Sequence, residues 1–88
     1  MKVIGIKELI RKDVPIYYRR LYSGILEIEL INKSVESHID FLIETKPTGV
    51  NEVIINNMDS IDYPLLPLTK EIKKFITVLD ETGGLPSL

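Results

Sequence analysis

Hydrophobic and polar residues alternate with a period of two in four stretches of the chain. This pattern is typical of antiparallel strands with one buried face. It is clearest where Leu26, Ile28 and Leu30 alternate with two glutamates. The four stretches cover residues 16–22, 26–30, 39–43 and 50–55. Because short segments separate them, we expect a four-stranded antiparallel meander.

The segment Lys46-Pro47-Thr48-Gly49 predicts how the last two strands pair. Proline suits the first turn position, and glycine in a left-handed conformation closes a three-residue hairpin loop with a bulge. This register sets Lys46 opposite Val50 and keeps the apolar side chains on one side. The pairs that follow are Ile43 with Val53, Phe41 with Ile55, and Leu42 with Ile54.

A second turn is predicted at Tyr22-Ser23-Gly24, followed by Ile25. Its residue types resemble those of the first turn, and its neighbours alternate in the same way. We therefore expect a first hairpin here. The pairs expected in it are Tyr18 with Ile28, Ile16 with Leu30, Arg19 with Glu27, Tyr17 with Glu29, and Leu21 with Ile25.

After Asn57 the apolar period changes to 3.6, which predicts a C-terminal helix. Its apolar stripe comprises Leu68, Ile72, Phe75, Ile76 and Leu79. Asp62 or Thr69 is the expected N-terminal cap, and Gly83 is the expected left-handed residue that ends the helix. Pro64 and Pro67 suit only a first turn.

The N-terminal segment has two interpretations. Residues 2–6 fit an edge strand, whereas Ile6, Leu9 and Ile10 fit one short helical turn. The predicted fold class is therefore α+β: a four-stranded antiparallel meander followed by one C-terminal helix, with an uncertain N-terminal strand or short helical turn. We expect residues 1–88 to form one domain.

The chain has 88 residues and no cysteine, so neither disulfides nor thiolate zinc sites supplement its small core. A partner subunit is the remaining supplement. Neither an export signal nor an apolar run of about 18 residues is found, and we expect a cytoplasmic protein that does not enter a membrane.

The formal net charge is −2, but it is unevenly distributed. Residues 1–34 carry seven Lys/Arg and four Asp/Glu, a net +3, and residues 35–88 carry four and nine, a net −5. The basic half interleaves cations with tyrosines, as single-stranded nucleic-acid sites do. The candidate contact residues are Lys7, Arg11, Lys12, Tyr17 and Arg19. Arg20 is expected on the core side, where its long side chain passes the helix edge to reach water.

Charges on the predicted helix oppose its macrodipole. Lys70, Lys73 and Lys74 come early, and Asp80 and Glu81 come late. If the helix begins near Thr69, its free N–H groups and the three lysines would form an anion site. The alternative is an ordinary solvated lysine face.

The sheet face away from the helix is expected to be apolar at several positions. Leu21, Ile25, Leu42 and Ile54 fall on it, with Ile31 nearby. Such a patch normally has a cover. We therefore expect a homo-oligomer, most simply a dimer, that associates through this face or through a sheet edge.

Catalytic and metal sites are weakly indicated. His38 and Asp40 share the helix-free face with Glu44, Glu52 and Asn56, but no second histidine supports a transition-metal site. Asp59 and Asp62 lack the rest of a calcium loop. Ser23, Ser34, Ser37 and Ser60 have no evident base partner. We predict no catalytic residues, no metal and no cofactor.

The order of elements, four strands and a helix in a unit that dimerises, resembles the single-stranded-DNA-binding transcriptional-coactivator and Whirly folds. The resemblance covers topology and no motif. The leading hypothesis is a small non-enzymatic interaction module, and the alternative is a single-stranded nucleic-acid binder that uses the N-terminal Arg/Lys/Tyr segment.

Overall fold

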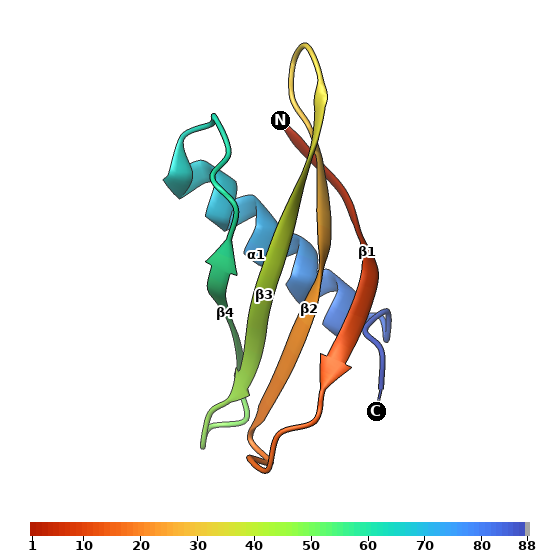
Figure 1. Ribbon diagram of the computed structural model, residues 1–88. Helices are drawn as coiled ribbons and strands as arrows, with labels where there is room; N and C mark the ends of the chain where they lie inside the picture. The colour runs from red at the N-terminus through yellow and green to blue at the C-terminus, as the bar shows by residue number, and fades with distance from the viewer. Residues whose placement is uncertain (88) are drawn as a thin grey trace.

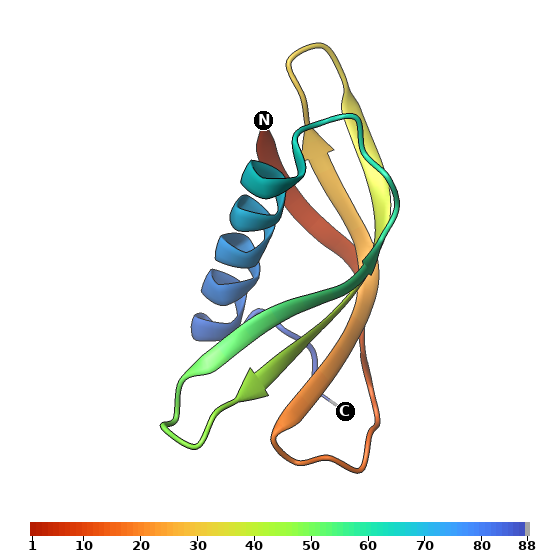
Figure 2. The same ribbon diagram turned by 90° about the vertical axis from the view of Figure 1, so that its left-hand side faces the viewer.

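The computed structural model describes residues 1–87, which form an open antiparallel sheet with one helix across one of its faces (Figures 1 and 2). The strands follow one another in the sheet in chain order. The predicted α+β class is confirmed. The elements are β1 (Lys2–Lys12), β2 (Arg19–Glu29), β3 (Ser34–Thr45), β4 (Asn51–Met58) and α1 (Leu65–Glu81).

The hairpin between β3 and β4 has the predicted register. The Lys46 N–H donates a hydrogen bond to the Val50 carbonyl at 2.9 Å, and Gly49 has a φ of 88°. Such a left-handed residue closes the bulged loop that proline and glycine favour. The confirmed pairs are Ile43 with Val53, Phe41 with Ile55, and Leu42 with Ile54.

The predicted turn at Ser23 and Gly24 is wrong, because β2 runs through it without a break. A Cβ on Gly24 would lie 2.7 Å from Cγ2 of Ile6, so this glycine allows close approach of β1. The first strand of the meander is therefore β1, and residues 16–18 precede β2. The incorrect pairs are Tyr18 with Ile28, Ile16 with Leu30, Arg19 with Glu27, Tyr17 with Glu29, and Leu21 with Ile25.

The N-terminal segment is a strand along its whole predicted length, and the interpretation of a helical turn is wrong. Its ladder shifts register twice, between Val3 and Gly5 and between Lys7 and Ile10, with Glu8 at a φ of 52°. An extra residue at a bulge changes which face the following side chains reach. Ile6 and Leu9 therefore both pack on the core at a spacing that imitates a helix.

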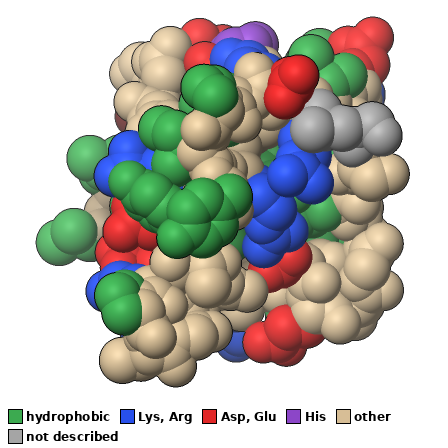
Figure 3. Space-filling view, turned by 90° about the horizontal axis from the view of Figure 1, so that it is seen from below, with side chains coloured by type: hydrophobic (Ala, Val, Ile, Leu, Met, Phe, Trp, Pro, Cys, Tyr) green, Lys and Arg blue, Asp and Glu red, His purple; other side chains and the backbone are tan. Residues whose placement is uncertain are grey.

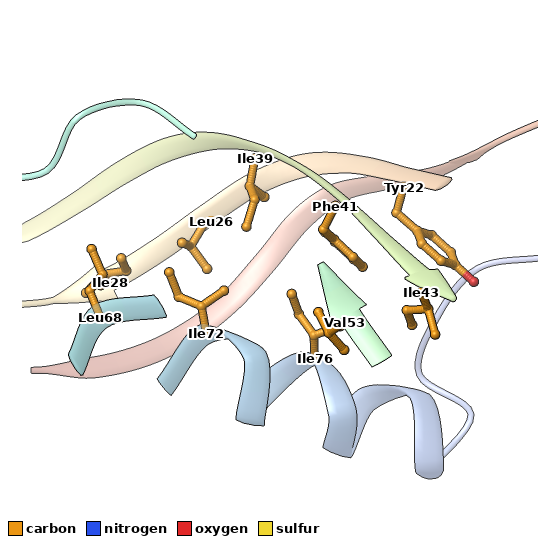
Figure 4. Packing of buried hydrophobic residues seen from close by; sticks show 10 residues of the cluster. All are labelled: Tyr22, Leu26, Ile28, Ile39, Phe41, Ile43, Val53, Leu68, Ile72 and Ile76. Atoms are coloured by element: carbon orange, nitrogen blue, oxygen red, sulfur yellow. The ribbon is translucent and has the colours of Figure 1, made fainter. Parts of the chain in front are cut away.

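The core lies between the sheet and α1 (Figure 4). Tyr22 and Phe41 stack at its centre, with ring centroids 5.2 Å apart. The helix contributes the predicted stripe. The fully buried side chains of the cluster are Tyr22, Leu26, Ile28, Ile39, Phe41, Ile43, Leu68, Ile72 and Ile76.

The helix begins earlier than predicted. Pro64 is its N-cap, no side chain caps it, and Pro67 stands in its first turn. The expected caps Asp62 and Thr69 are both wrong, because prolines lack the N–H groups that such caps would satisfy. At the other end Gly83 is left-handed as predicted, with a φ of 74°. The Gly84 N–H donates to the Leu79 carbonyl at 2.8 Å, which completes a Schellman motif.

Candidate interaction surfaces

The helix-free face of the sheet has an apolar row across three strands. Leu21 of β2 lies opposite Leu42 of β3, which lies opposite Ile54 of β4. Leu42 is only 7% exposed although no helix covers it, and Leu21, Ile25 and Ile54 are half-buried. Ile31 does not join this row: it lies in the loop between β2 and β3 and is 93% exposed.

Two lysines of β1 cross this face to reach carboxylates of β3. Lys12 stands opposite Leu21, and its Nζ lies 3.4 Å from Oδ1 of Asp40. Lys7 stands opposite Ile25 and pairs with Glu36. Because β2 lies between β1 and β3, the aliphatic parts of both lysines pass over it and cover its apolar residues.

The ion pairs shift the pKa values of their members. The hydroxyl of Ser23, followed by the ammonium of Lys12, lowers the pKa of Asp40. Hydrogen bonding and charge from Glu36 raise the pKa of Lys7. Arg19 adds a third pair, with Nε 3.0 Å from Oε2 of Glu44. The helix-free face is thus largely closed by its own charged side chains.

Ser23, His38 and Asp40 lie together on the same face. The Ser23 Oγ is 3.4 Å from Nε2 of His38, whose Nδ1 is 4.0 Å from Oδ2 of Asp40. Both distances exceed those of a working serine triad. Backbone N–H groups of two central strands are used in the ladders, so they supply no oxyanion donors. Within residues 1–87, no group of three His, Asp or Glu side chains is arranged to hold a metal.

The predicted nucleic-acid residues are not brought together. Lys7, Lys12 and Arg19 lie on the helix-free face, each beside a carboxylate. Arg11 lies opposite Tyr22, on the core side of β1. Tyr17 precedes β2. Lys70, Lys73 and Lys74 belong to α1 in the other layer.

The anion site on the helix also loses its premise. The helix begins at Leu65, so its first free N–H groups lie away from Lys70, Lys73 and Lys74. The nucleic-acid hypothesis stays a prediction, and the structure gives it no common cationic surface.

A groove of about 310 Å³ runs between the start of β1 and the helix (Figure 2). Val78 on its wall is 51% exposed, and Ile4 in the adjoining strand is 42% exposed. The outer edge of β1 faces no other strand within the described residues. The lining residues are Met1, Lys2, Val3, Glu71, Lys74, Phe75 and Val78.

A second cleft, of about 500 Å³, lies at the end of the sheet where β2 begins and the β3–β4 hairpin turns. Figure 3 views the molecule from this end and shows hydrophobic side chains beside Lys and Arg side chains. Tyr17 is 97% exposed there. The lining residues are Tyr17, Tyr18, Glu44, Thr45, Lys46 and Pro47. The sequence marks the two tyrosines, but it does not place Pro47 beside them.

The fold and its surfaces define a small α+β protein with open grooves at a sheet edge and at a sheet end. The chain belongs to the BB_0187 family, whose family model matches residues 1–81. No curated protein and no solved structure matches the chain. None of the described helices is long and apolar enough to span a membrane.

Proposed function

We propose that this protein is a non-enzymatic interaction module that forms a homodimer through the groove between β1 and α1. The open groove is the observation that supports the proposal, because it combines exposed apolar side chains with a strand edge that no described strand covers. The helix-free face is less suited, because Lys7 and Lys12 already cross it.

The helix side of the groove has a second stripe beside the core stripe. Glu71, Lys74, Phe75 and Val78 are spaced i, i+3, i+4 and i+7, which places them along one side of α1. Two members are apolar and two have opposite charges. Within residues 1–87, neither Glu71 nor Lys74 forms an ion pair.

This stripe is self-complementary. In a dimer with a two-fold axis, a surface meets its own copy, so residue i contacts j and j contacts i. An axis passing between Glu71 and Lys74 sets each opposite the other residue of the partner copy. The apolar neighbours then lose water together, and the opposite charges fix the register.

Strand addition along the whole of β1 is a less favourable contact. The ladder of β1 is interrupted by two bulges, and Glu8 has a left-handed backbone. Bulges of this kind protect an edge strand from regular pairing. The proposed contact therefore uses side chains of the groove more than backbone hydrogen bonds.

Sedimentation velocity over a concentration series tests the proposal. The wild-type chain should sediment as a dimer, and Val78→Glu should sediment as a monomer, since it places an unpaired charge in the contact. The matched control is Thr77→Glu, an exposed neighbouring position outside the groove. Glu71→Lys and Lys74→Glu should each weaken the dimer, and the double substitution should restore it.

A wild-type chain that stays monomeric at about 1 mM would overturn the proposal. A dimer that survives Val78→Glu would place the contact elsewhere and would equally overturn the assignment to this groove. We also infer a cytoplasmic location, which the absence of cysteine supports.

A further inference from the structure

We propose that the cleft at the end of the sheet binds an extended, proline-containing segment of a partner protein. We call it the tyrosine cleft, after Tyr17 and Tyr18 on its wall. It shares no lining residue with the groove between β1 and α1. The proposal therefore stands independently of the homodimer.

The aromatic wall of the tyrosine cleft is held in place by its surroundings. The rings of Tyr17 and Tyr18 are perpendicular, with centroids 5.6 Å apart. The Tyr18 carbonyl accepts a hydrogen bond from the Thr45 N–H at 2.8 Å, and the guanidinium of Arg19 lies 5.7 Å from the Tyr18 ring centroid. A wall ordered before binding saves the entropy of arranging it around a ligand.

The charges around the tyrosine cleft are already balanced. Arg19 pairs with Glu44, and Lys46 pairs with Glu52 across the hairpin. This pairing with Glu52 raises the pKa of Lys46 and lowers that of Glu52. A phosphate backbone requires cations that are free to replace its counterions. The balanced charges thus favour an uncharged peptide over a nucleic acid.

The remaining polar groups also match an extended peptide. Within residues 1–87, the hydroxyls of Tyr17 and Tyr18 donate to no side chain or carbonyl. A polyproline II segment makes no internal hydrogen bonds, so its carbonyls are available as acceptors. Proline rings pack on aromatic walls in the domains that recognise such segments. Two tyrosines beside Pro47 provide both kinds of contact.

The test is an NMR titration of the full, ¹⁵N-labelled chain with a ten-residue polyproline peptide. Amide signals of residues 17–18 and 44–47 should shift in a saturable way. Tyr17→Ala should weaken binding about tenfold, since it removes the exposed ring. Tyr17→Phe keeps the ring and should lose less. The matched control is Ile31→Ala, which removes an equally exposed side chain from the loop between β2 and β3.

A Gly-Ser peptide of the same length and an oligothymidine provide the comparison ligands. No saturable shift with polyproline at about 1 mM peptide would overturn the proposal. Shifts of the same residues with oligothymidine, but not with polyproline, would overturn it in favour of base stacking. Unfolding by Tyr17→Ala is not expected because its side chain is 97% exposed, and thermal melting of each variant checks this point.

Discussion

Arg20 joins β2 to the last turn of the helix. Its Nη1 and Nη2 donate to the two carboxylate oxygens of Asp80 at 2.9 and 3.1 Å, and Nη1 also lies 3.2 Å from the Tyr22 hydroxyl. The Asn51 amide donates to the same carboxylate at 3.3 Å. A fork-shaped guanidinium matches a carboxylate in this way. The pair explains why an acidic residue stands at the end of the helix that the macrodipole disfavours.

Asp80→Asn should lower the free energy of unfolding by about 1–2 kcal/mol, because it leaves the half-buried guanidinium of Arg20 without its charged acceptor. The decrease should correspond to about 4–16 °C in melting temperature for a chain of this size. Urea denaturation and thermal melting measure it. Glu81→Gln, at the exposed neighbouring position, is the control and should change stability by no more than about 0.5 kcal/mol.

An equal loss in Asp80→Asn and Glu81→Gln would show that the contact with Arg20 stabilises nothing. At the residue scale, alternation along β2 predicts that Arg20 faces the core side. Its partner is not predictable from the sequence, because Asp80 is sixty residues away and the distance closes only when the helix crosses the sheet.

At the scale of elements, the contact between β1 and β2 depends on Gly24. Besides Cγ2 of Ile6 at 2.7 Å, a Cβ there would lie 3.2 Å from the carbonyl oxygen of Lys7. Both neighbours belong to the bulged part of β1. The glycine therefore provides the space that the bulge occupies.

Gly24→Ala should destabilise the protein by about 1–3 kcal/mol, because the added methyl group forces β1 away from β2. Gly5→Ala is the matched control: it lies in β1, and a Cβ there would meet nothing within 4 Å. Its effect should be within about 0.5 kcal/mol of zero. Chemical denaturation of the two variants measures the difference, and equal stabilities would contradict the packing role of Gly24.

The same element shows why the sequence predicts a wrong first hairpin. Ser-Gly flanked by apolar residues is turn chemistry, and Gly49 fulfils that role with a φ of 88°. Gly24 has no such backbone, and its glycine is required by a neighbouring strand instead. Local residue types are alike in the two cases, so only the position of β1 distinguishes them.

At the scale of the whole molecule, ion pairs between strands connect the basic N-terminal half with the acidic remainder. Lys7, Lys12 and Arg19 contact carboxylates of β3, and Lys46 contacts one of β4. The charge asymmetry along the chain is therefore used largely within the molecule. Less of it remains for a nucleic acid than the sequence indicates.

These pairs give the stability a predictable dependence on pH. The pKa values of Asp40 and Glu52 are lowered in the folded chain, from ordinary values of 3.8 and 4.5. Their contribution is present above those values and is lost as the pH falls through the folded pKa. The pKa values of Lys7 and Lys46 are raised from 10.5, so their contribution is lost as the pH rises through the folded pKa.

We expect a plateau of stability between about pH 5 and pH 10, with a decrease on either side. Asp40→Asn should be less stable than wild type at about pH 7, and the difference should shrink as the pH is lowered to about 2. Urea denaturation at several pH values measures it. The control is Glu29→Gln, at an exposed carboxylate without an ion pair among the described residues, and a difference for Asp40→Asn that is independent of pH would contradict the prediction.

The α+β class, the β3–β4 hairpin and the buried stripe of the helix follow from the sequence alone. Each depends on periodicity or on turn residues close together in the chain, such as Lys46–Gly49. The other features arise only when the sheet assembles. A bulge at Glu8, a glycine that admits a neighbouring strand, and lysines that reach across β2 all depend on which strand lies beside which. That choice minimises the free energy of the whole packed sheet, and no local window of sequence contains it.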